Sequence, residues 1–157
     1  MTESECRVAD WKRVGHTDGG SGVSESRLAS YTEDCGKIGI EPDARAYRQG
    51  WDLGIAQYCI PANGWRAGVE GHSDQASVCI GQPNYEGFSR YLQAGLQVHE
   101  TQSRMNRNDD EARRLQKKLD EAKTDEDKHR IRDQLRSIDH DQFNLRTVLQ
   151  LQRTNAP

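Results

Sequence analysis

Apolar residues in the second half of the chain recur at alternating steps of three and four, which is the spacing of one face of a long helix. Two stretches carry this pattern. The first contains Tyr91, Ala94, Val98, Thr101, Met105, Asn108, Ala112, Leu115, Leu119 and Ala122, and the second contains Ile131, Leu135, Ile138, Gln142, Leu145 and Leu149. Asn108 and Gln142 interrupt the two apolar faces. A mean step of about 3.5 residues predicts two helices that pair as a coiled coil.

A short acidic segment, residues 123–127, separates the two stretches. Thr124 followed by Asp127 resembles a capping box, with Asp in place of the usual Glu or Gln. Acidic residues also suit the positive end of the dipole of a new helix. Because the connection is short, we expect an antiparallel helical hairpin over residues 84–157, with arms about 50 Å long at about 1.5 Å per residue.

In the first half, aromatic residues and glycines recur together. They stand at Trp11, Gly15 and Gly19, at Tyr47, Gly50 and Gly54, at Trp65 and Gly68, and more weakly at Tyr91 and Gly95. Glycines four apart share one face of a helix, where another backbone can approach closely. We therefore expect short helices packed through these glycines. The alternative, a phosphate-binding loop over residues 18–22, is disfavoured because no strand signal precedes it.

Turn-forming residues divide this first half into short helices. The first ends at residues 19–22, and a second crosses Leu28–Cys35 after a cap at Ser24 or Ser26, ending at Gly36 or Gly39. A third runs from Pro42 through Tyr58, and residues 61–64 separate it from a short helix at Trp65–Gly71. No period-2 run of β-branched residues occurs, so we expect an all-α fold.

Composition changes abruptly near Pro83, which predicts a boundary between a cysteine- and glycine-rich helical module, residues 1–83, and the hairpin extension, residues 84–157. Only 33% of residues are hydrophobic and 30% are charged, with a mean hydropathy of -0.99. This composition suits a small core with an elongated, solvated part. The net charge is -4 over residues 1–83 and +1 over residues 84–157, so neither half favours nucleic acid as a partner.

All four cysteines lie in the first module: Cys6, Cys35, Cys59 and Cys79. A zinc site is the less favoured alternative, because the spacings contain no C-x-x-C and no histidine at zinc-finger distance. Two structural disulfides fit better, since a small polar module buries too little apolar surface to be secure without them. Of the three possible connectivities we expect Cys6–Cys35 and Cys59–Cys79, because this pairing closes consecutive helix–loop units.

The titratable residues do not form a catalytic motif. His72, Ser73 and Asp74 have the residue types of a hydrolase triad, but consecutive side chains cannot form the relay. The acidic runs at residues 125–127 and 139–141 point in different directions on a helix, so we expect solvated faces and no metal site. We expect no cofactor and no enzymatic activity, although a deep polar pocket in the first module would favour an enzyme.

The first module resembles a proteobacterial family catalogued as domain of unknown function 2799. The resemblance covers about residues 6–95 and rests on spaced cysteine, aromatic and glycine positions, with the string Tyr58-Cys59-x-Pro61-x-Asn63-Gly64 at its centre. The family implies short envelope lipoproteins with an N-terminal signal and a lipid-modified cysteine. We accordingly expect a mature fragment whose precursor is periplasmic and anchored to the outer membrane, with the lipid anchor as its only membrane attachment.

These observations predict a non-enzymatic envelope protein that binds or scaffolds another protein through its hairpin. The candidate protein-binding residues are charged and exposed on the expected helices: Arg113, Arg114, Lys117, Lys118, Asp133 and Asp139. Two alternatives stay open, an immunity or inhibitor protein that neutralises a periplasm-acting toxin, and a periplasmic enzyme. The sequence leaves the partner and the oligomeric state undetermined.

Overall fold

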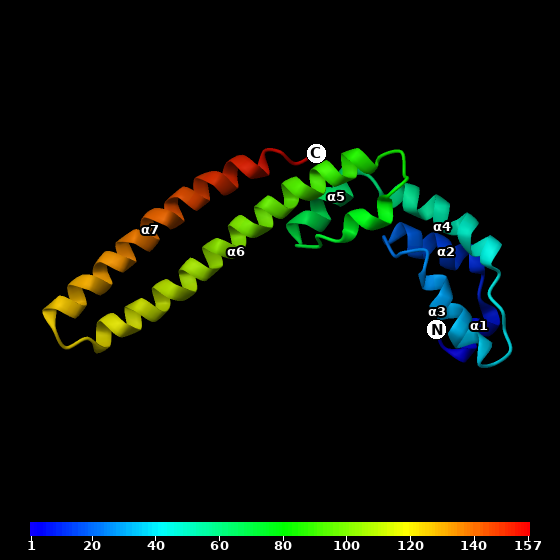
Figure 1. Ribbon diagram of the computed structural model, residues 1–157, viewed down its shortest axis with the longest axis horizontal. Helices are drawn as coiled ribbons and strands as arrows, with labels where there is room; N and C mark the ends of the chain where they lie inside the picture. The colour runs from blue at the N-terminus through cyan, green and yellow to red at the C-terminus, as the bar shows by residue number, and fades with distance from the viewer.

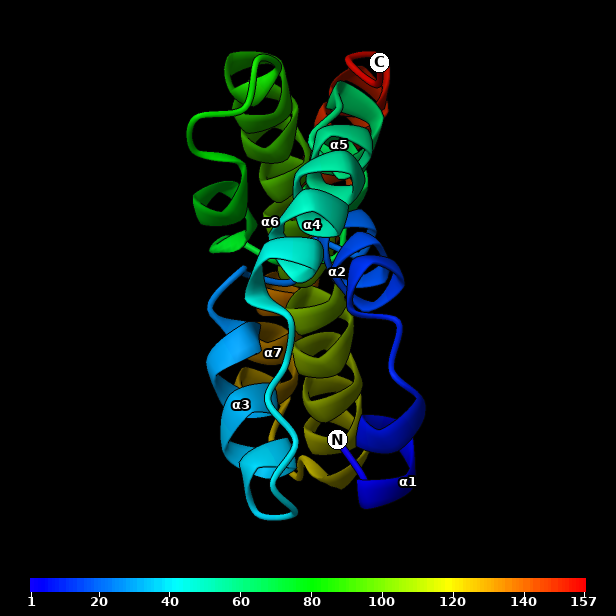
Figure 2. The same cartoon turned by 90° about the vertical axis from the view of Figure 1, so that its right-hand side faces the viewer.

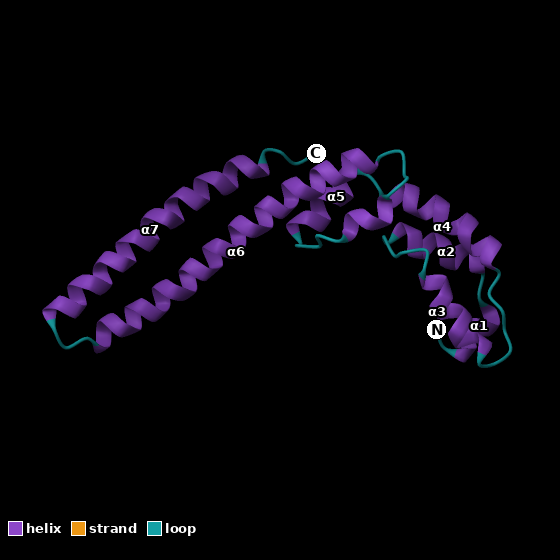
Figure 3. Cartoon of the chain, in the orientation of Figure 1, coloured by secondary structure: helices purple, strands orange, loops and turns teal.

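The computed structural model describes residues 1–157 and contains helices but no strands, which confirms the predicted all-α fold (Figure 3). The elements are α1 Glu3–Val8, α2 Trp11–Gly20, α3 Arg27–Gly36, α4 Ala44–Tyr58, α5 Pro61–Val69, the 3-10 helix η1 Gln75–Cys79, α6 Tyr85–Glu121 and α7 Asp125–Arg153. They form an elongated, arched molecule in which helix pairs follow one another: α2 runs parallel to α4, α5 runs parallel to α6, and α6 and α7 are antiparallel (Figure 1). Viewed from the end that holds the N-terminus, α3 and α1 both lie below the α2–α4 pair, with α3 on the left and α1 on the right (Figure 2).

Side-chain caps begin most of the helices. Asp10 and Asp43 accept hydrogen bonds from the backbone N–H of Arg13 and Ala46, at 3.1 and 2.9 Å. Thr124 accepts from the N–H of Asp127 at 3.1 Å, as predicted, while its own hydroxyl donates to the Asp127 carboxylate at 2.7 Å. Each cap satisfies a backbone donor that the first turn of a helix leaves free.

Of the two predicted caps of α3, Ser26 does not cap the helix, and Ser24 acts one step earlier, where its hydroxyl accepts from the backbone N–H of Ser26 at 3.3 Å in the turn that leads into α3. The two hydroxyls bond to each other at 2.9 Å, and Ser26 makes no capping bond. The first backbone N–H groups of the helix instead reach the carbonyls of residues 24–26 at 3.0–3.1 Å. Because this tight turn already satisfies those donors, no side-chain cap is required.

Helix α5 begins earlier than predicted, at Pro61 instead of Trp65, and ends at Val69. Residues 61–64 look like a loop because they combine Pro, Asn and Gly. Pro61 occupies the first helical position, where its fixed φ suits the helix and its missing N–H costs nothing. The side chain of Asn63 donates to the carbonyl of Tyr58 at 2.8 Å and holds the new helix against the end of α4.

Helices α2 and α4 pack with their backbones in contact, as the glycine spacing predicts. A Cβ atom built on Gly15 or Gly19 would collide with the carbonyl oxygen of Tyr47 or Trp51, respectively. From the other helix, a Cβ on Gly50 or Gly54 would collide with a backbone carbonyl of α2. Both helices therefore need glycine at these positions.

The α5–α6 pair repeats this packing. A Cβ on Gly64 would meet the carbonyl oxygen of Phe88, a Cβ on Gly68 that of Leu92, and a Cβ on Gly95 that of Trp65. In both pairs a glycine with positive φ follows the first helix, and a side-chain ring of the second helix packs against it. Tyr58 covers Gly22, and His99 covers Gly71. The weak sequence echo at Tyr91 and Gly95 thus belongs to a second copy of the same helix-pair arrangement.

The two disulfides are Cys6–Cys35 and Cys59–Cys79, which confirms the predicted pairing and leaves no free cysteine. Each joins Cα atoms 5.6 Å apart. The first links α1 to α3, and the second links the end of α4 to η1. All four cysteines are buried, so the cross-links form part of the core.

Helix α6 serves both the cysteine module and the hairpin. Its first turns carry Phe88 and Leu92, which are fully buried in the cluster that also holds Cys59 and Cys79. The predicted boundary at residues 83/84 falls immediately before this helix. We use the term head for residues 1–99 and hairpin for residues 100–157.

The hairpin is antiparallel, and every predicted inward position is buried or half-buried. The two polar positions form a hydrogen-bonded layer. Gln142 donates to Asp109 at 2.7 Å and to the carbonyl of Met105 at 3.2 Å, while Asn108 donates to Asp141 at 2.7 Å. Because any shift of one helix along the other breaks these bonds, the layer fixes the register of α6 and α7.

Tyrosine hydroxyls connect the helices of the head around one carboxylate. Tyr47 of α4 and Tyr31 of α3 donate to Asp18 of α2 at 2.8 and 3.1 Å. Burial, followed by the hydrogen bond to Asp18, raises the pKa of Tyr47 above its usual range. Since the fold favours the neutral phenol, this stabilisation is complete below about pH 10 and is lost as the pH rises beyond it.

Tyr47→Phe is therefore expected to be less stable than the wild type by about 1 kcal/mol at pH 8, because one hydrogen bond is lost. The difference should shrink and then reverse above about pH 10, because the Tyr47 phenol then ionises in the unfolded wild type and stabilises its unfolded state, which the Phe variant cannot do. Urea unfolding of both proteins across this pH range measures it. A difference that does not change with pH contradicts the assignment.

Candidate functional site

The basic residues predicted to bind a partner lie on α6, where Arg113 and Lys117 occupy the side turned away from α7 and Arg114 and Lys118 lie on its flank. Leu115 is buried against α7, and Arg113 and Lys117 stand two residues on either side of it, about 200° around the helix. Arg113 pairs with Asp110, and Arg114 pairs with Glu111 at 3.5 Å. Lys117 and Lys118 have no carboxylate within 4.0 Å, and all four basic residues are exposed.

Asp133 lies on α7, on the opposite side of the hairpin from these basic residues. It stands two residues after Ile131, which is buried against α6, and it pairs with Arg136 and, at 3.5 Å, with His129. The negative charge of Asp133 is thus largely compensated by basic residues of its own helix. The structure therefore does not bring the six predicted residues together into one surface.

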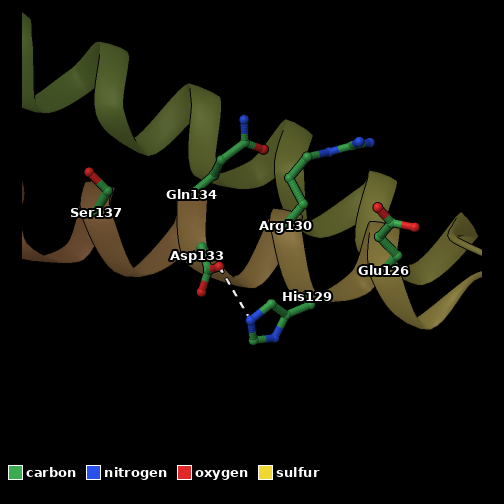
Figure 4. Close-up of a pocket in the computed structure, with 6 residues that line it drawn as sticks. All are labelled: Glu126, His129, Arg130, Asp133, Gln134 and Ser137. Atoms are coloured by element: carbon green, nitrogen blue, oxygen red, sulfur yellow. Dashed lines mark ion pairs between the residues drawn. The ribbon is translucent and has the colours of Figure 1, made fainter.

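A shallow hollow of about 510 Å³ runs along this part of α7. Its lining is wholly polar and comes from one helix: Glu126, His129, Arg130, Asp133, Gln134 and Ser137 (Figure 4). Arg130 also bonds to Asp127 at 2.7 Å. Because no second element closes the hollow and its charges pair along the helix, it gives a ligand few free groups to contact.

Asp139, in contrast, belongs to a row of exposed residues four apart on α7. The row, which we call the α7 ridge, consists of Asp139, Phe143, Thr147 and Leu151. Phe143 is 66% exposed and Leu151 is 65% exposed. Leu145 and Leu149, which are buried against α6, lie about 200° around the helix from these two side chains. The ridge thus points into solvent with two large apolar groups two turns apart.

Free charges surround the α7 ridge. Asp139 forms one end of it, and Arg146, three residues after Phe143, is exposed beside it, whereas Arg153 stands two residues after Leu151 and lies about 200° around the helix from that side chain. None of the three has an oppositely charged partner within 4.0 Å. The ridge therefore combines an apolar centre with unpaired charges at its border.

The polar layer of the hairpin lies directly behind the ridge. Gln142, which precedes Phe143, is buried and donates hydrogen bonds to Asp109 and to the carbonyl of Met105. Asp141 accepts from Asn108 and pairs with Arg104 at 3.4 Å. These bonds fix the rotation of α7 at this level, so the direction in which Phe143 points is set before any partner binds.

The sequence prediction missed Phe143 and Leu151, although the sequence holds a signal for them. Both are apolar residues outside the inward-facing positions, and both fall on a row with a step of four. Such residues on a polar helix have no core to join, and a row of them indicates an outward-facing contact surface.

The histidines make local contacts. His72 lies 3.5 Å from the carboxylate of Glu70 and makes no contact with Asp74. His99 bonds to the carbonyl of Val69 at 3.0 Å, and His140 bonds to Asn144 at 3.3 Å. No group of three or more His, Cys, Asp or Glu side chains is arranged to hold a metal ion. None of the helices combines the length with the apolar run that crossing a bilayer requires.

Comparison with known proteins gives one match. Residues 10–97 match the family described as "Protein of unknown function (DUF2799)". The matched segment holds both glycine-packed helix pairs and ends in α6, so α7 and its ridge lie beyond it. No curated protein and no solved structure matches the chain.

Proposed function

We propose that this chain, which belongs to the family Protein of unknown function (DUF2799), is a non-enzymatic protein-binding component of an oxidising compartment such as the bacterial periplasm. Its α7 ridge is the contact surface, and its head is the platform from which the hairpin projects. The observation that carries the proposal is the exposure of Phe143 and Leu151 two turns apart on a helix whose other outward residues are mostly polar.

The partner that fits the ridge is a helical protein surface with an apolar groove. Side chains four apart form the ridges that enter the grooves between side chains of a second helix. Large apolar side chains at the centre of an interface supply most of its binding energy, and the charges at its border direct association. Asp139 and Arg146 provide such a border, so association is expected to weaken as salt rises.

The hairpin is large enough for a stable interface. A typical interface uses about 800 Å² and about 20–30 residues of each partner. Helix α7 alone has 29 residues, and the fixed register of the hairpin lowers the entropy lost on binding. The basic residues on the outer side of α6 are too far around the hairpin to touch the same helix, and we assign them a role in long-range attraction and solubility.

The oxidising compartment is proposed from the two disulfides. Buried disulfides in a small, polar domain are typical of proteins that leave the reducing cytosol. Localisation in the envelope, and the lipid anchor of the precursor, rest on the resemblance of the first module and remain part of the proposal. An immunity or inhibitor role would use the same surface, and the identity of the partner would distinguish it from scaffolding.

The test compares two matched double variants of the full chain. Phe143→Ala with Leu151→Ala removes the apolar side chains of the ridge, and Val8→Ala with Ile80→Ala removes exposed apolar side chains of the head. The partner is first identified by cross-linking and pull-down from an envelope extract. Its Kd for the ridge variant is expected to rise about 30-fold or more, while the head variant keeps the wild-type value. Equal binding by the two variants contradicts the proposal.

A further inference from the structure

The head contains a polar hollow where its two helix pairs meet. Its volume is about 410 Å³, within the range of about 300–1,000 Å³ that is usual for small-molecule sites. Its polar lining comes mainly from α4, α5 and the segment around the start of η1: Tyr58, Asn63, Arg66, Glu70, His72 and Gln75. Ser21, just after α2, completes the edge. Residues from both pairs thus contribute to one hollow.

The inner wall of the hollow is held in place by the fold. The ring of Tyr58 lies against Gly22, where any side chain would collide with it. Gln75 donates to the carbonyl of Gly22 at 2.9 Å, and Asn63 donates to the carbonyl of Tyr58 at 2.8 Å. These contacts fix the two amides and the phenol before a ligand enters, so the site is largely preformed.

Two oppositely charged residues at the mouth of the hollow do not form an ion pair with each other. Arg66 lies on α5 and Glu70 directly follows its end, four residues on and about 6 Å along the helix axis, yet no ion pair joins them. Arg66 donates instead to the side-chain oxygen of Asn63 at 3.1 Å, and Glu70 lies 3.5 Å from His72. The mouth of the hollow therefore offers both a guanidinium group and a carboxylate, one turn apart.

The hydroxyl of Tyr58 lies close enough to both charges to respond to each. Burial is the main cause that raises the pKa of Tyr58, Arg66 opposes this change, and Glu70 adds to it. The group is therefore a neutral phenol at physiological pH, able to donate or accept a hydrogen bond. A ligand in the hollow thus meets a cation, an anion and neutral polar groups between them.

We propose that this hollow binds a small zwitterion, an amino acid or a short peptide, with its carboxylate on Arg66 and its ammonium group on Glu70. A guanidinium group matches a carboxylate in shape and charge. Tyr58 and Gln75 would contact the polar groups between the two charged ends. The hollow does not include any residue of α7, so this site is independent of the proposed binding role of the ridge.

The test uses the full disulfide-bonded chain, labelled for amide NMR and titrated with alanine, alanyl-alanine, N-acetyl-alanyl-alanine and alanyl-alanine amide. Saturable shifts are expected around residues 58, 66, 70 and 75. Blocking either end of the dipeptide should weaken binding about tenfold, and comparison of alanine with alanyl-alanine shows which source of the zwitterion fits better.

Charge-neutral variants identify the partner of each end. Arg66→Gln should abolish the difference between alanyl-alanine and its amide, and Glu70→Gln should abolish the difference between alanyl-alanine and its N-acetyl form. Arg45→Gln, an exposed change on α4, is the matched control and should keep both differences. The absence of saturable shifts with alanine and alanyl-alanine at millimolar concentration overturns the proposal, as do shifts that both charge variants retain unchanged.

Discussion

Gly50→Ala is expected to destabilise the head by about 3 kcal/mol or more, the largest effect that a single methyl group has in this chain. The new Cβ would collide with the carbonyl oxygen of Lys12 and would also lie within 3.0 Å of the backbone nitrogen of His16. Backbone atoms cannot rotate away as a flexible side chain does, so α2 and α4 must separate. The loss of packing outweighs the gain of up to about 1 kcal/mol that alanine brings to a helix.

Gly20→Ala is the matched control for this prediction. Gly20 lies on the same helix as Gly15 and Gly19, but a Cβ built on it meets no atom within 4 Å. Its replacement is expected to leave stability unchanged or raise it by up to about 1 kcal/mol. Urea unfolding followed by circular dichroism measures both variants. Equal stabilities would show that the α2–α4 backbones are not in contact.

The second large effect is expected for Cys59→Ala combined with Cys79→Ala. Their disulfide closes a separation of 20 residues. Its loss raises the conformational entropy of the unfolded chain, which destabilises the folded state by about 3 kcal/mol at 25 °C. Because Cys59 and Cys79 pack with Phe88 and Leu92, the variant should also loosen the joint between α5 and α6. Thermal unfolding should shift to a clearly lower temperature for the head and for the hairpin that continues from it.

The variant pair Cys6→Ala and Cys35→Ala supplies the comparison. This disulfide closes a separation of 29 residues, so its entropic contribution is similar, about 3–4 kcal/mol. It lies in the other core cluster, with Trp11 and Tyr47, away from α6. Its loss should therefore destabilise the α2–α4 pair and spare the α5–α6 pair. Amide hydrogen exchange resolves the two regions, and identical exchange patterns in the two variants would contradict this division.

Both predictions follow from the way in which this polar chain stabilises a small head. Its core is two clusters of seven and five buried residues, too few to hold five helices by burial alone. Direct contact between backbones adds dispersion across α2–α4 and α5–α6, and the disulfides limit the freedom of the unfolded chain.

The elements that the sequence predicted well are those determined by spacing. Residues such as Leu115 and Leu145 had to face inward because apolar positions on a helix pair repeat at steps of three and four. The cysteine pairing followed from short loops, and the glycine contacts followed from glycines four apart. Local chemistry was less decisive. In the sequence, Pro61 and Gly64 suggest a loop. In the structure, Pro61 begins α5, and Gly64 allows α6 to approach closely.

The binding surface could be predicted less well than the fold. Charged residues such as Arg113 and Asp133 attract attention in a sequence, but on a helix they pair with neighbours three or four residues away. Their position around the hairpin depends on which face is buried. The exposure of Phe143 becomes evident only once the register of α6 and α7 is known, and the hollow at Arg66 and Glu70 requires the packing of two distant segments.

Site-specific photo-cross-linking tests the central claim most directly. A photoreactive residue replaces Thr147, at the middle of the α7 ridge, or Lys117, on the exposed outer side of α6. Both positions are exposed, and the rest of the chain is unchanged. In the bacterial envelope, position 147 is expected to cross-link one protein in a salt-sensitive manner, and position 117 is expected not to. A partner captured from position 117 and not from position 147, or from neither position, contradicts the assignment of the ridge as the binding surface.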